Sequence, residues 1–343
     1  MKHLLNTLYV TAPDRYLSLD GENVVIRSED KEIGRIPLHN LEAIVTFGYQ
    51  GASPALMGAC VQRNIDLSFL SPNGHFLARV SGEVRGNVTL RKQQYRLSEN
   101  GDGSIMVARN CITGKVFNSR WVLERAARDY PMRLDSDKLK EKSSFLAKSL
   151  RKIRECNSEA ELRGLEGEAA SVYFSVFDDL ILQQKDLFYF HGRNKRPPLD
   201  RVNAMLSFAY TLLAGMCGAA LETVGLDPYV GFLHTDRPGR MSLALDMMEE
   251  LRSVLADRFV LTLINKRIVS GEAFSVKENG AVIMDDETRK LFLSQWQMKK
   301  QETITHPFLD EKIEWGMVPY VQAMLLARYI RGDLDEYPPF LWK

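Results

Sequence analysis

Apolar and polar residues alternate along residues 1–85, and turn residues interrupt this alternation at short intervals. A period of two is typical of β-strands that bury one face. The expected strands are 16–19, 24–26, 33–36, 41–47, 65–70 and 76–80. Asp20-Gly21 fits the tight turn of a hairpin, and Ser53-Pro54 fits the start of a short helix. These patterns predict a small two-layer β domain that holds one helix.

The pattern becomes helical after a polar stretch at residues 86–100, which we interpret as a linker. Apolar residues then recur at the spacing of a helix face. The expected helices are 110–130, 135–154, 161–184, 201–224, 243–264, 286–302 and 318–330, and residues 270–284 resemble a β-hairpin. The sequence therefore predicts an α+β protein, with a β-rich domain at 1–85 and a larger helical domain at 101–343.

Composition narrows the class of protein without naming a function. Of 343 residues, 45% are hydrophobic and 26% are charged, which suits a globular chain with a sizeable core. The formal net charge is +1, so DNA binding would have to depend on local basic patches. The four cysteines lie far apart, which argues against a zinc site or disulfides. We see no signal peptide and no stretch of about 18 uninterrupted apolar residues, so we expect a cytoplasmic protein without membrane contact.

The first candidate for chemistry is Glu166, which Gly167 follows inside a predicted helix. A glycine within a helix costs roughly 1 kcal/mol relative to alanine, so a ligand or another backbone approaching closely would explain it. The alternative is a simple helix crossing, with Glu166 and Glu168 both solvated.

His234 and the pair Asp246 and Glu249 are the next candidates. Asp246 and Glu249 are three residues apart and share a helix face. One imidazole and two carboxylates suit a hard divalent ion such as Mg²⁺ or Mn²⁺, which assists phosphodiester chemistry. The alternatives are a hydrogen-bonded histidine at the end of an apolar run and an ordinary acidic surface patch.

Basic residues accompany these segments. They are Arg193, Lys195 and Arg196, in a loop closed by two prolines, and Arg237 and Arg240, shortly after His234. Guanidinium groups bind phosphate oxygens in pairs, so these five are our candidates for DNA contacts. Each taken singly also fits a solvated surface charge.

Four segments together resemble one family in order and spacing. They are Leu162-Arg163-Gly164-Leu165-Glu166-Gly167, residues 200–210, Gly231-Phe232-Leu233-His234 and Leu245-Asp246-Met247-Met248-Glu249. The family is the larger, universal protein of CRISPR adaptation, the endonuclease and integrase of spacer acquisition. The resemblance is strongest in the helical part, and the length and the ending Tyr337-Pro338-Pro339-Phe340 suggest a type I system.

The resemblance implies an N-terminal β-sandwich-like domain for dimerisation and partner contacts, followed by an all-α catalytic domain. It implies a homodimer that binds a small ferredoxin-like subunit and DNA. It places the metal ligands on Glu166, His234 and Glu249, with Asp246 supporting them. The implied reaction is a transesterification, in which the 3′ hydroxyl of a short captured DNA attacks a phosphodiester at the edge of a repeat.

Two other functions fit the same residues. One is a structure-specific, repair-type endonuclease with the same metal site and no role in integration. The other is a non-catalytic DNA-binding scaffold, which the near-neutral charge and the simpler alternatives for each residue favour.

Overall fold

The computed structural model describes residues 6–29, 31–72, 76–82 and 88–343, which form two compact units. The first contains residues 1–85 and 285–302, and the second contains 86–284 and 303–343. The first unit therefore includes the helix α9 (Asp286–Gln301), which comes late in the chain. The sequence predicts this segment as part of the helical domain, because local periodicity cannot show which core a helix joins.

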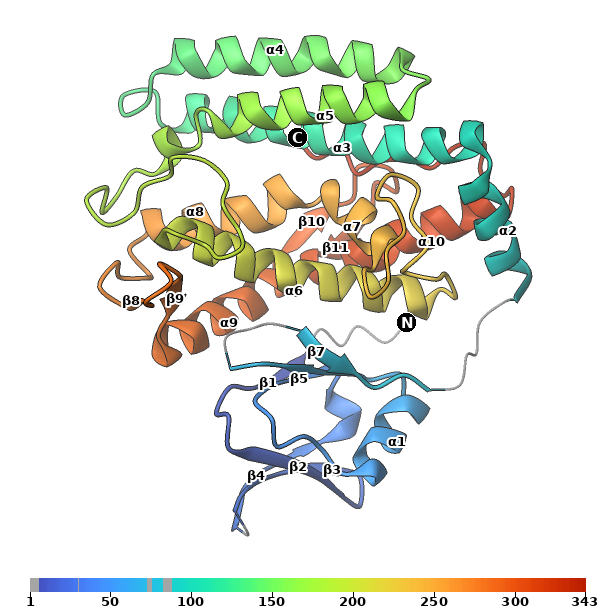
Figure 1. Cartoon of the computed structure of the whole chain (residues 1–343), viewed down its shortest axis with the longest axis vertical. Coiled ribbons are helices and arrows are strands. Elements are labelled where there is room, and N and C mark those ends of the chain that lie inside the picture. The colour runs from blue at the N-terminus through green and yellow to red at the C-terminus, as the bar shows by residue number, and fades with distance from the viewer. Residues whose placement is uncertain (1–5, 30, 73–75, 83–87) are drawn as a thin grey trace. The chain divides into compact units, whose positions relative to one another are not determined.

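The first unit contains two sheets (Figure 1). β2 (Arg15–Asp20), β3 (Asn23–Ser28) and β4 (Lys31–Pro37) form an antiparallel meander. The other sheet has the order β1-β5-β6-β7, from β1 (Thr7–Val10), β5 (Ala43–Phe47), β6 (Asp66–Leu70) and β7 (Phe76–Arg79). β1 and β6 both run parallel to β5, and β7 is antiparallel to β6.

The predicted start of the helix in this unit is confirmed. α1 (Pro54–Gln62) begins after Ser53, whose hydroxyl accepts the N–H of Leu56 at 3.2 Å. Its buried face joins both sheets in one apolar core that includes Leu17, Ile44 and Leu67. Gly21 has a φ of +57°, which fits the expected β2–β3 turn.

The second unit is helical (Figure 1). Its helices are α2 (Val88–Glu99), α3 (Gly101–Asp129), α4 (Ser136–Glu155), α5 (Glu159–Phe174), α6 (Arg201–Thr223), α7 (Ser242–Glu249), α8 (Arg258–Asn265) and α10 (Val318–Ile330). Short hairpins are formed by β8 (Phe274–Val276) with β9 (Val282–Met284) and by β10 (Thr303–Thr305) with β11 (Lys312–Glu314). The expected α+β class, a β-rich part followed by a larger helical domain, is confirmed.

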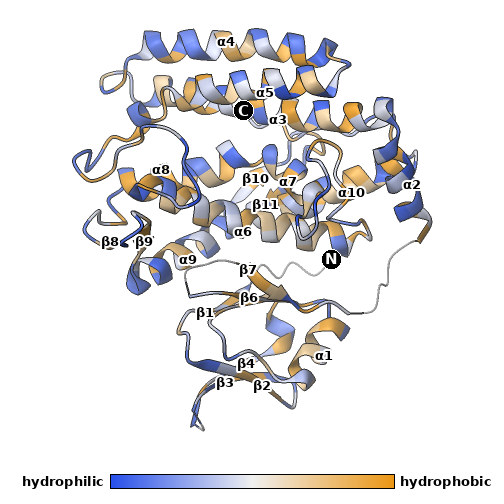
Figure 2. Cartoon of the chain, viewed as in Figure 1, coloured by the Kyte–Doolittle hydropathy of each residue, from blue (hydrophilic) through white to orange (hydrophobic). Residues whose placement is uncertain are grey.

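Amphipathic helices cover a buried central helix in this unit. α4 packs on α3 and α5, and its buried Leu139, Leu146 and Ile153 recur every seven residues between hydrophilic positions (Figure 2). α6 is long and apolar enough to cross a bilayer, yet it packs against α7, α8 and α10, and most of its apolar residues are buried. Burial in a protein core thus accounts for its composition.

Four expected boundaries differ from the structure. The helix expected at 110–130 already begins at Gly101, as α3. Most of the expected linker at 86–100 forms α2, whose Gln94 is fully buried, while residues 83–87 lie outside the described part of the chain. The helix expected at 161–184 ends at Phe174. The one expected at 243–264 is interrupted by the π-helical turn η3 (Arg252–Asp257). In α2 and η3, Gln94 and Asp257 form hydrogen bonds with distant segments, and no local pattern predicts such contacts.

Candidate functional site

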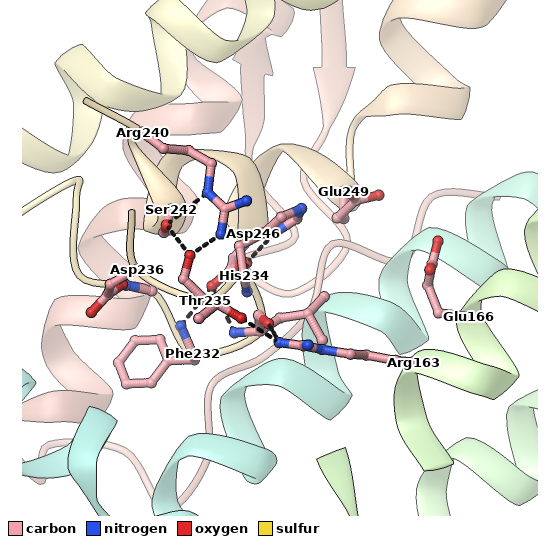
Figure 3. A network of polar contacts seen from close by, with 12 residues as sticks. Arg163, Glu166, Phe232, His234, Thr235, Asp236, Arg240, Ser242, Asp246 and Glu249 are labelled. Atoms are coloured by element: carbon pink, nitrogen blue, oxygen red, sulfur yellow. Dashed lines mark hydrogen bonds and ion pairs between the residues drawn. The ribbon is translucent and has the colours of Figure 1, made fainter. Parts of the chain in front are cut away.

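The loop that carries His234 is folded around the Asp246 carboxylate of α7 (Figure 3). Asp246 Oδ2 accepts the N–H groups of Phe232 at 2.7 Å and Leu233 at 2.9 Å. Its Oδ1 accepts the N–H of His234 at 2.9 Å and lies 2.6 Å from His234 Nδ1. With Nδ1 as the donor, the lone pair of His234 Nε2 is left for a metal or a substrate.

Gly231 makes this fold of the loop possible. A Cβ atom at this position would lie 2.8 Å from Ser242 Cβ and 2.9 Å from Asp246 Oδ2. Any side chain would therefore push the loop away from α7, and the row of N–H groups would lose its acceptor. The Gly-Phe-Leu-His motif thus combines a close approach at its first residue with a fixed imidazole at its last.

Glu249 lies one helical turn after Asp246 and is buried. Its Oε1 is 2.9 Å from the Arg252 guanidinium, and its Oε2 is 2.8 Å from Lys115 Nζ. Burial raises the pKa of Glu249, but Arg252 and Lys115 outweigh it and bring the pKa down to about 2. The carboxylate is therefore negatively charged throughout the neutral range.

Glu166 approaches the same place from α5. Its carboxylate contacts the ammonium of Lys115, which thus lies between Glu166 and Glu249. Arg163, one turn earlier, donates to the carbonyl of Leu233 at 2.7 Å and to the Thr235 hydroxyl at 3.0 Å. Arg163 therefore holds α5 against the loop that carries His234, and Figure 3 shows Glu166, His234 and Glu249 on different elements.

The donor set suits a hard divalent cation, although the side chains do not enclose one in this conformation. Among the described residues, no three His, Cys, Asp or Glu side chains are close enough to hold a metal ion. Oε2 of Glu249 is buried and has no hydrogen bond of regular geometry, only the ion pair with Lys115. A buried carboxylate oxygen paired with a lysine, beside a second carboxylate and an available imidazole nitrogen, fits Mg²⁺ or Mn²⁺.

A buried polar network supports the site from the side of α6. Tyr210 donates its hydroxyl to Asp257 Oδ1 at 2.6 Å, and Tyr173 donates to Oδ2 at 3.1 Å. Burial raises the pKa of Asp257 to about 6, although both hydrogen bonds lower it. The guanidinium carbons of Arg193 and Arg252 each lie 5.2 Å from the centre of the Tyr210 ring. Tyr210 thus holds the arginine that pairs with Glu249.

A family model matches residues 8–298 of this chain, and it describes CRISPR associated protein Cas1. The chain belongs to the Cas1 family. It is 50% identical over 343 residues, the whole of both chains, to the CRISPR-associated endonuclease Cas1 1 of Chlorobaculum tepidum. This match confirms the family resemblance predicted from the sequence motifs. All four of those motifs lie in the helical unit.

Two solved structures share the fold of this Cas1 chain. A casposase bound to integration product has a TM-score of 0.84 at 22% identity, with 98% of this chain and 93% of that chain covered. A chain of a Cas6-RT-Cas1–Cas2 complex has a TM-score of 0.83 at 21% identity, covering 100% of this chain and 36% of that chain. At these identities the likeness establishes the fold.

The basic residues expected to bind DNA in this Cas1 chain differ in exposure and in how far their side chains are engaged in hydrogen bonds within the protein. Arg193 is committed to its own loop and to α6: it donates to the Asn194 carbonyl in the loop, and to Asn203 Oδ1 at 2.6 Å and Ser207 Oγ at 3.0 Å on the helix. Lys195 and Arg196 are exposed. Partial desolvation, followed by the charges of Arg252 and Arg193, lowers the pKa of Lys195, so this lysine lies near other cations.

The arginines after His234 also divide. Arg237 is exposed, whereas Arg240 is half-buried and donates to the carbonyl of Thr235, and so helps to close the loop. Glu168 is exposed, unlike Glu166 two residues earlier. The structure therefore brings Glu166, His234, Asp246 and Glu249 together in this Cas1 chain and leaves Glu168 outside.

Sequence reasoning missed Lys115, Arg252 and Tyr210 as parts of the site. Lys115 lies about fifty positions before Glu166, in a helix whose pattern is ordinary. The available signal was Gly114: a Cβ there would lie 2.9 Å from Glu250 Cγ, so α3 approaches α7 closely at this point. Where two helices approach this closely at a glycine, the polar residue beside it can reach the other helix, as Lys115 reaches Glu249.

Proposed function

We propose that this chain is a metal-dependent DNA endonuclease and strand transferase that inserts short captured DNA into a repeat array. The observation that carries the proposal is the site in which Glu166, Glu249 and the oriented His234 meet from α5, α7 and one loop. Membership of a family of CRISPR-associated endonucleases supports the nuclease part. The fold shared with a casposase bound to integration product supports the transferase part.

In this mechanism Glu166, Glu249 and Nε2 of His234 would hold Mg²⁺ or Mn²⁺. The ion would polarise the scissile phosphate and stabilise the leaving oxygen. Asp246 keeps His234 in the tautomer that presents Nε2, through its contact with Nδ1. Arg252 keeps the Glu249 carboxylate ionised and in place.

The reaction is a displacement at phosphorus. The 3′ hydroxyl of the short DNA forms the new P–O bond, and the bond to the leaving 3′ oxygen breaks. The proton lost by the attacking hydroxyl passes to solvent, and the leaving oxygen takes one up, so one phosphodiester replaces another. Water in place of the hydroxyl gives strand cleavage. Lys195, Arg196 and Arg237, all exposed, are the cations we assign to the DNA backbone.

The proposal includes partners. We infer a partner subunit, because a chain with the same fold occurs in a Cas6-RT-Cas1–Cas2 complex. The homodimer and the small, ferredoxin-like character of that subunit follow from the family resemblance. The assay below therefore includes this partner. Cleavage without joining is informative only when the subunit that joining is expected to need is present.

The test is a strand-transfer assay on a labelled duplex with a repeat-array target and added Mn²⁺. Glu166→Gln, His234→Ala and Glu249→Gln should each reduce joining at least about 100-fold, as expected when a metal ligand is lost. Glu168→Gln is the matched control, two residues from Glu166 and exposed, and should join at the wild-type rate.

Each of three outcomes would refute the proposal. Full joining by both Glu166→Gln and His234→Ala would show that the site is misplaced. Metal-dependent cleavage without any joined product, with the partner present, would indicate a repair-type endonuclease. DNA binding that is equal in EDTA, with no turnover under any metal, would indicate a scaffold.

A further inference from the structure

Lys115 occupies the space between the two acidic side chains of the proposed metal site. It is largely buried, its ammonium contacts the Glu166 carboxylate, and it lies 2.8 Å from Glu249 Oε2. α3 carries it there, and Gly114 allows the helix to approach α7. Lys115 is therefore a structural part of this site rather than a solvated surface charge.

The two cations around Glu249 are held differently. Arg252 is fixed by its contact with the Tyr210 ring and pairs with Oε1 at 2.9 Å. Lys115 faces Oε2, which lacks a hydrogen bond of regular geometry. A lysine side chain is a compact charge on a flexible four-carbon stem, so it can withdraw without disturbing the helix that carries it. Of the two cations, Lys115 is therefore the exchangeable one.

Lys115 and a divalent ion would compete for the same oxygens. Without either, two carboxylates would face each other in a largely buried place with only Arg252 to neutralise them, which is unfavourable. With both, a monovalent and a divalent cation would lie in contact and repel each other. Each arrangement with a single cation between Glu166 and Glu249 avoids both costs.

We propose that Lys115 is an exchangeable internal cation, which neutralises Glu166 and Glu249 when the site holds no divalent ion and leaves them when one binds. This inference rests on the proposed metal site and adds a residue that sets the affinity of that site. The lysine lowers the affinity for metal and keeps the metal-free site folded.

The first test measures Mn²⁺ binding to the full chain by calorimetry and by electron paramagnetic resonance. Lys115→Met should bind Mn²⁺ at least about tenfold more tightly than the wild type, because the competing charge is gone. Lys115→Arg, which keeps a cation, should show no such gain. Lys148→Met, on the exposed side of α4, is the matched control and should bind like the wild type. Unchanged or weaker binding by Lys115→Met would overturn the proposal.

The second test measures thermal unfolding. In EDTA, Lys115→Met should unfold at a lower temperature than Lys148→Met, because the acidic pair has lost its internal cation. Saturating Mn²⁺ should raise the unfolding temperature of Lys115→Met more than that of the wild type, since ligand binding to the folded state stabilises it. An equal increase in the two proteins would contradict an exchange between lysine and metal.

The two proposals fail in different ways. If the wild type binds Mn²⁺, if Glu166→Gln abolishes that binding, and if Lys115→Met leaves it unchanged, only the exchange is wrong. If neither the wild type nor Lys115→Met binds Mn²⁺, the metal-dependent function is wrong and the exchange with it.

Discussion

Replacing Asp246 by asparagine tests how the histidine loop is built. The Asp246 carboxylate is fully buried and accepts four hydrogen bonds, three from consecutive backbone N–H groups and one from His234 Nδ1. Asparagine has nearly the same shape, so Asp246→Asn leaves no cavity. It changes only the charge and one acceptor, which makes the effect attributable to hydrogen bonding.

The expected loss follows from the geometry of the amide. The asparagine side chain would offer one oxygen and one NH₂ group, whereas each carboxylate oxygen of Asp246 now serves two donors. With the NH₂ group in place of Oδ2, two backbone N–H groups face another donor; in place of Oδ1, only the His234 N–H does, because His234 Nδ1 can accept from the amide in its other tautomer. A hydrogen bond to a charged group contributes about 1.5–3 kcal/mol, so one or two lost bonds reduce the free energy of unfolding by about 1.5–6 kcal/mol. This is a large part of the roughly 5–15 kcal/mol that a folded protein has.

Catalysis should fall as well, because His234 would lose the partner that fixes its tautomer. Loss of such a supporting group reduces metal affinity or activity by about 10–100-fold. Urea unfolding and the strand-transfer assay measure the two effects. Asp236→Asn is the matched control: it lies in the same loop, is exposed and accepts one N–H, from Gly231 at 3.2 Å, so it should change stability by less than about 0.5 kcal/mol. If Asp246→Asn loses no more stability than Asp236→Asn and joins DNA within twofold of the wild type, the reasoning is refuted.

Three further predictions concern other parts of the helical unit. Burial raises the pKa of Glu250 from 4.5 to about 7, so its contribution to the unfolding free energy is complete below pH 4.5 and is lost as the pH rises to 7. Relative to Glu250→Gln, the wild type should lose up to about 3 kcal/mol of unfolding free energy over that range. Parallel pH profiles of the two proteins would contradict this. A Cβ at Gly167 meets no atom within 4 Å, so Gly167→Ala should raise the unfolding free energy by about 0.5–1 kcal/mol, and a loss of stability would show that the helix needs the glycine. Arg193→Ala should lower the free energy of unfolding by about 1–3 kcal/mol, because its partners Asn203 and Ser207 lose their donor. Arg196→Ala should weaken DNA binding and change the free energy of unfolding by less than about 0.5 kcal/mol. The reverse pattern would refute the assignment of Arg193 to structure and of Arg196 to DNA binding.

The elements that could be predicted are those with a local cause. The strands β2 to β7 follow from alternation, and α1 begins where Ser53 and Pro54 favour a helix start. α6 follows from a long apolar run. In each case neighbours in the sequence supply the interactions that fix the structure, so the pattern of residue types is enough.

α2 and the turn η3 could not be predicted, because their causes lie elsewhere in the chain. α2 is polar for most of its length, and its buried Gln94 donates to the carbonyls of Asp227 at 2.8 Å and Val230 at 3.1 Å. η3 presents Asp257 to Tyr173 and Tyr210, on two other helices. Gly167 is the opposite case: no backbone of the described residues approaches it closely, since a Cβ there would meet no atom within 4 Å.

The neighbours Glu249 and Glu250 show why residue type alone leaves the roles in the site open. Glu249 faces two cations, Arg252 and Lys115, which more than offset the effect of burial and lower its pKa to about 2. Glu250 faces uncharged donors, the Gln322 amide at 3.0 Å, the Tyr337 hydroxyl at 2.5 Å and the Phe340 N–H at 2.5 Å, and burial prevails. One glutamate is therefore held as an anion, ready to pair with a cation, and the other fastens the end of the chain. Because both are buried in one short segment, the cations beyond it decide which of the two stays ionised at neutral pH.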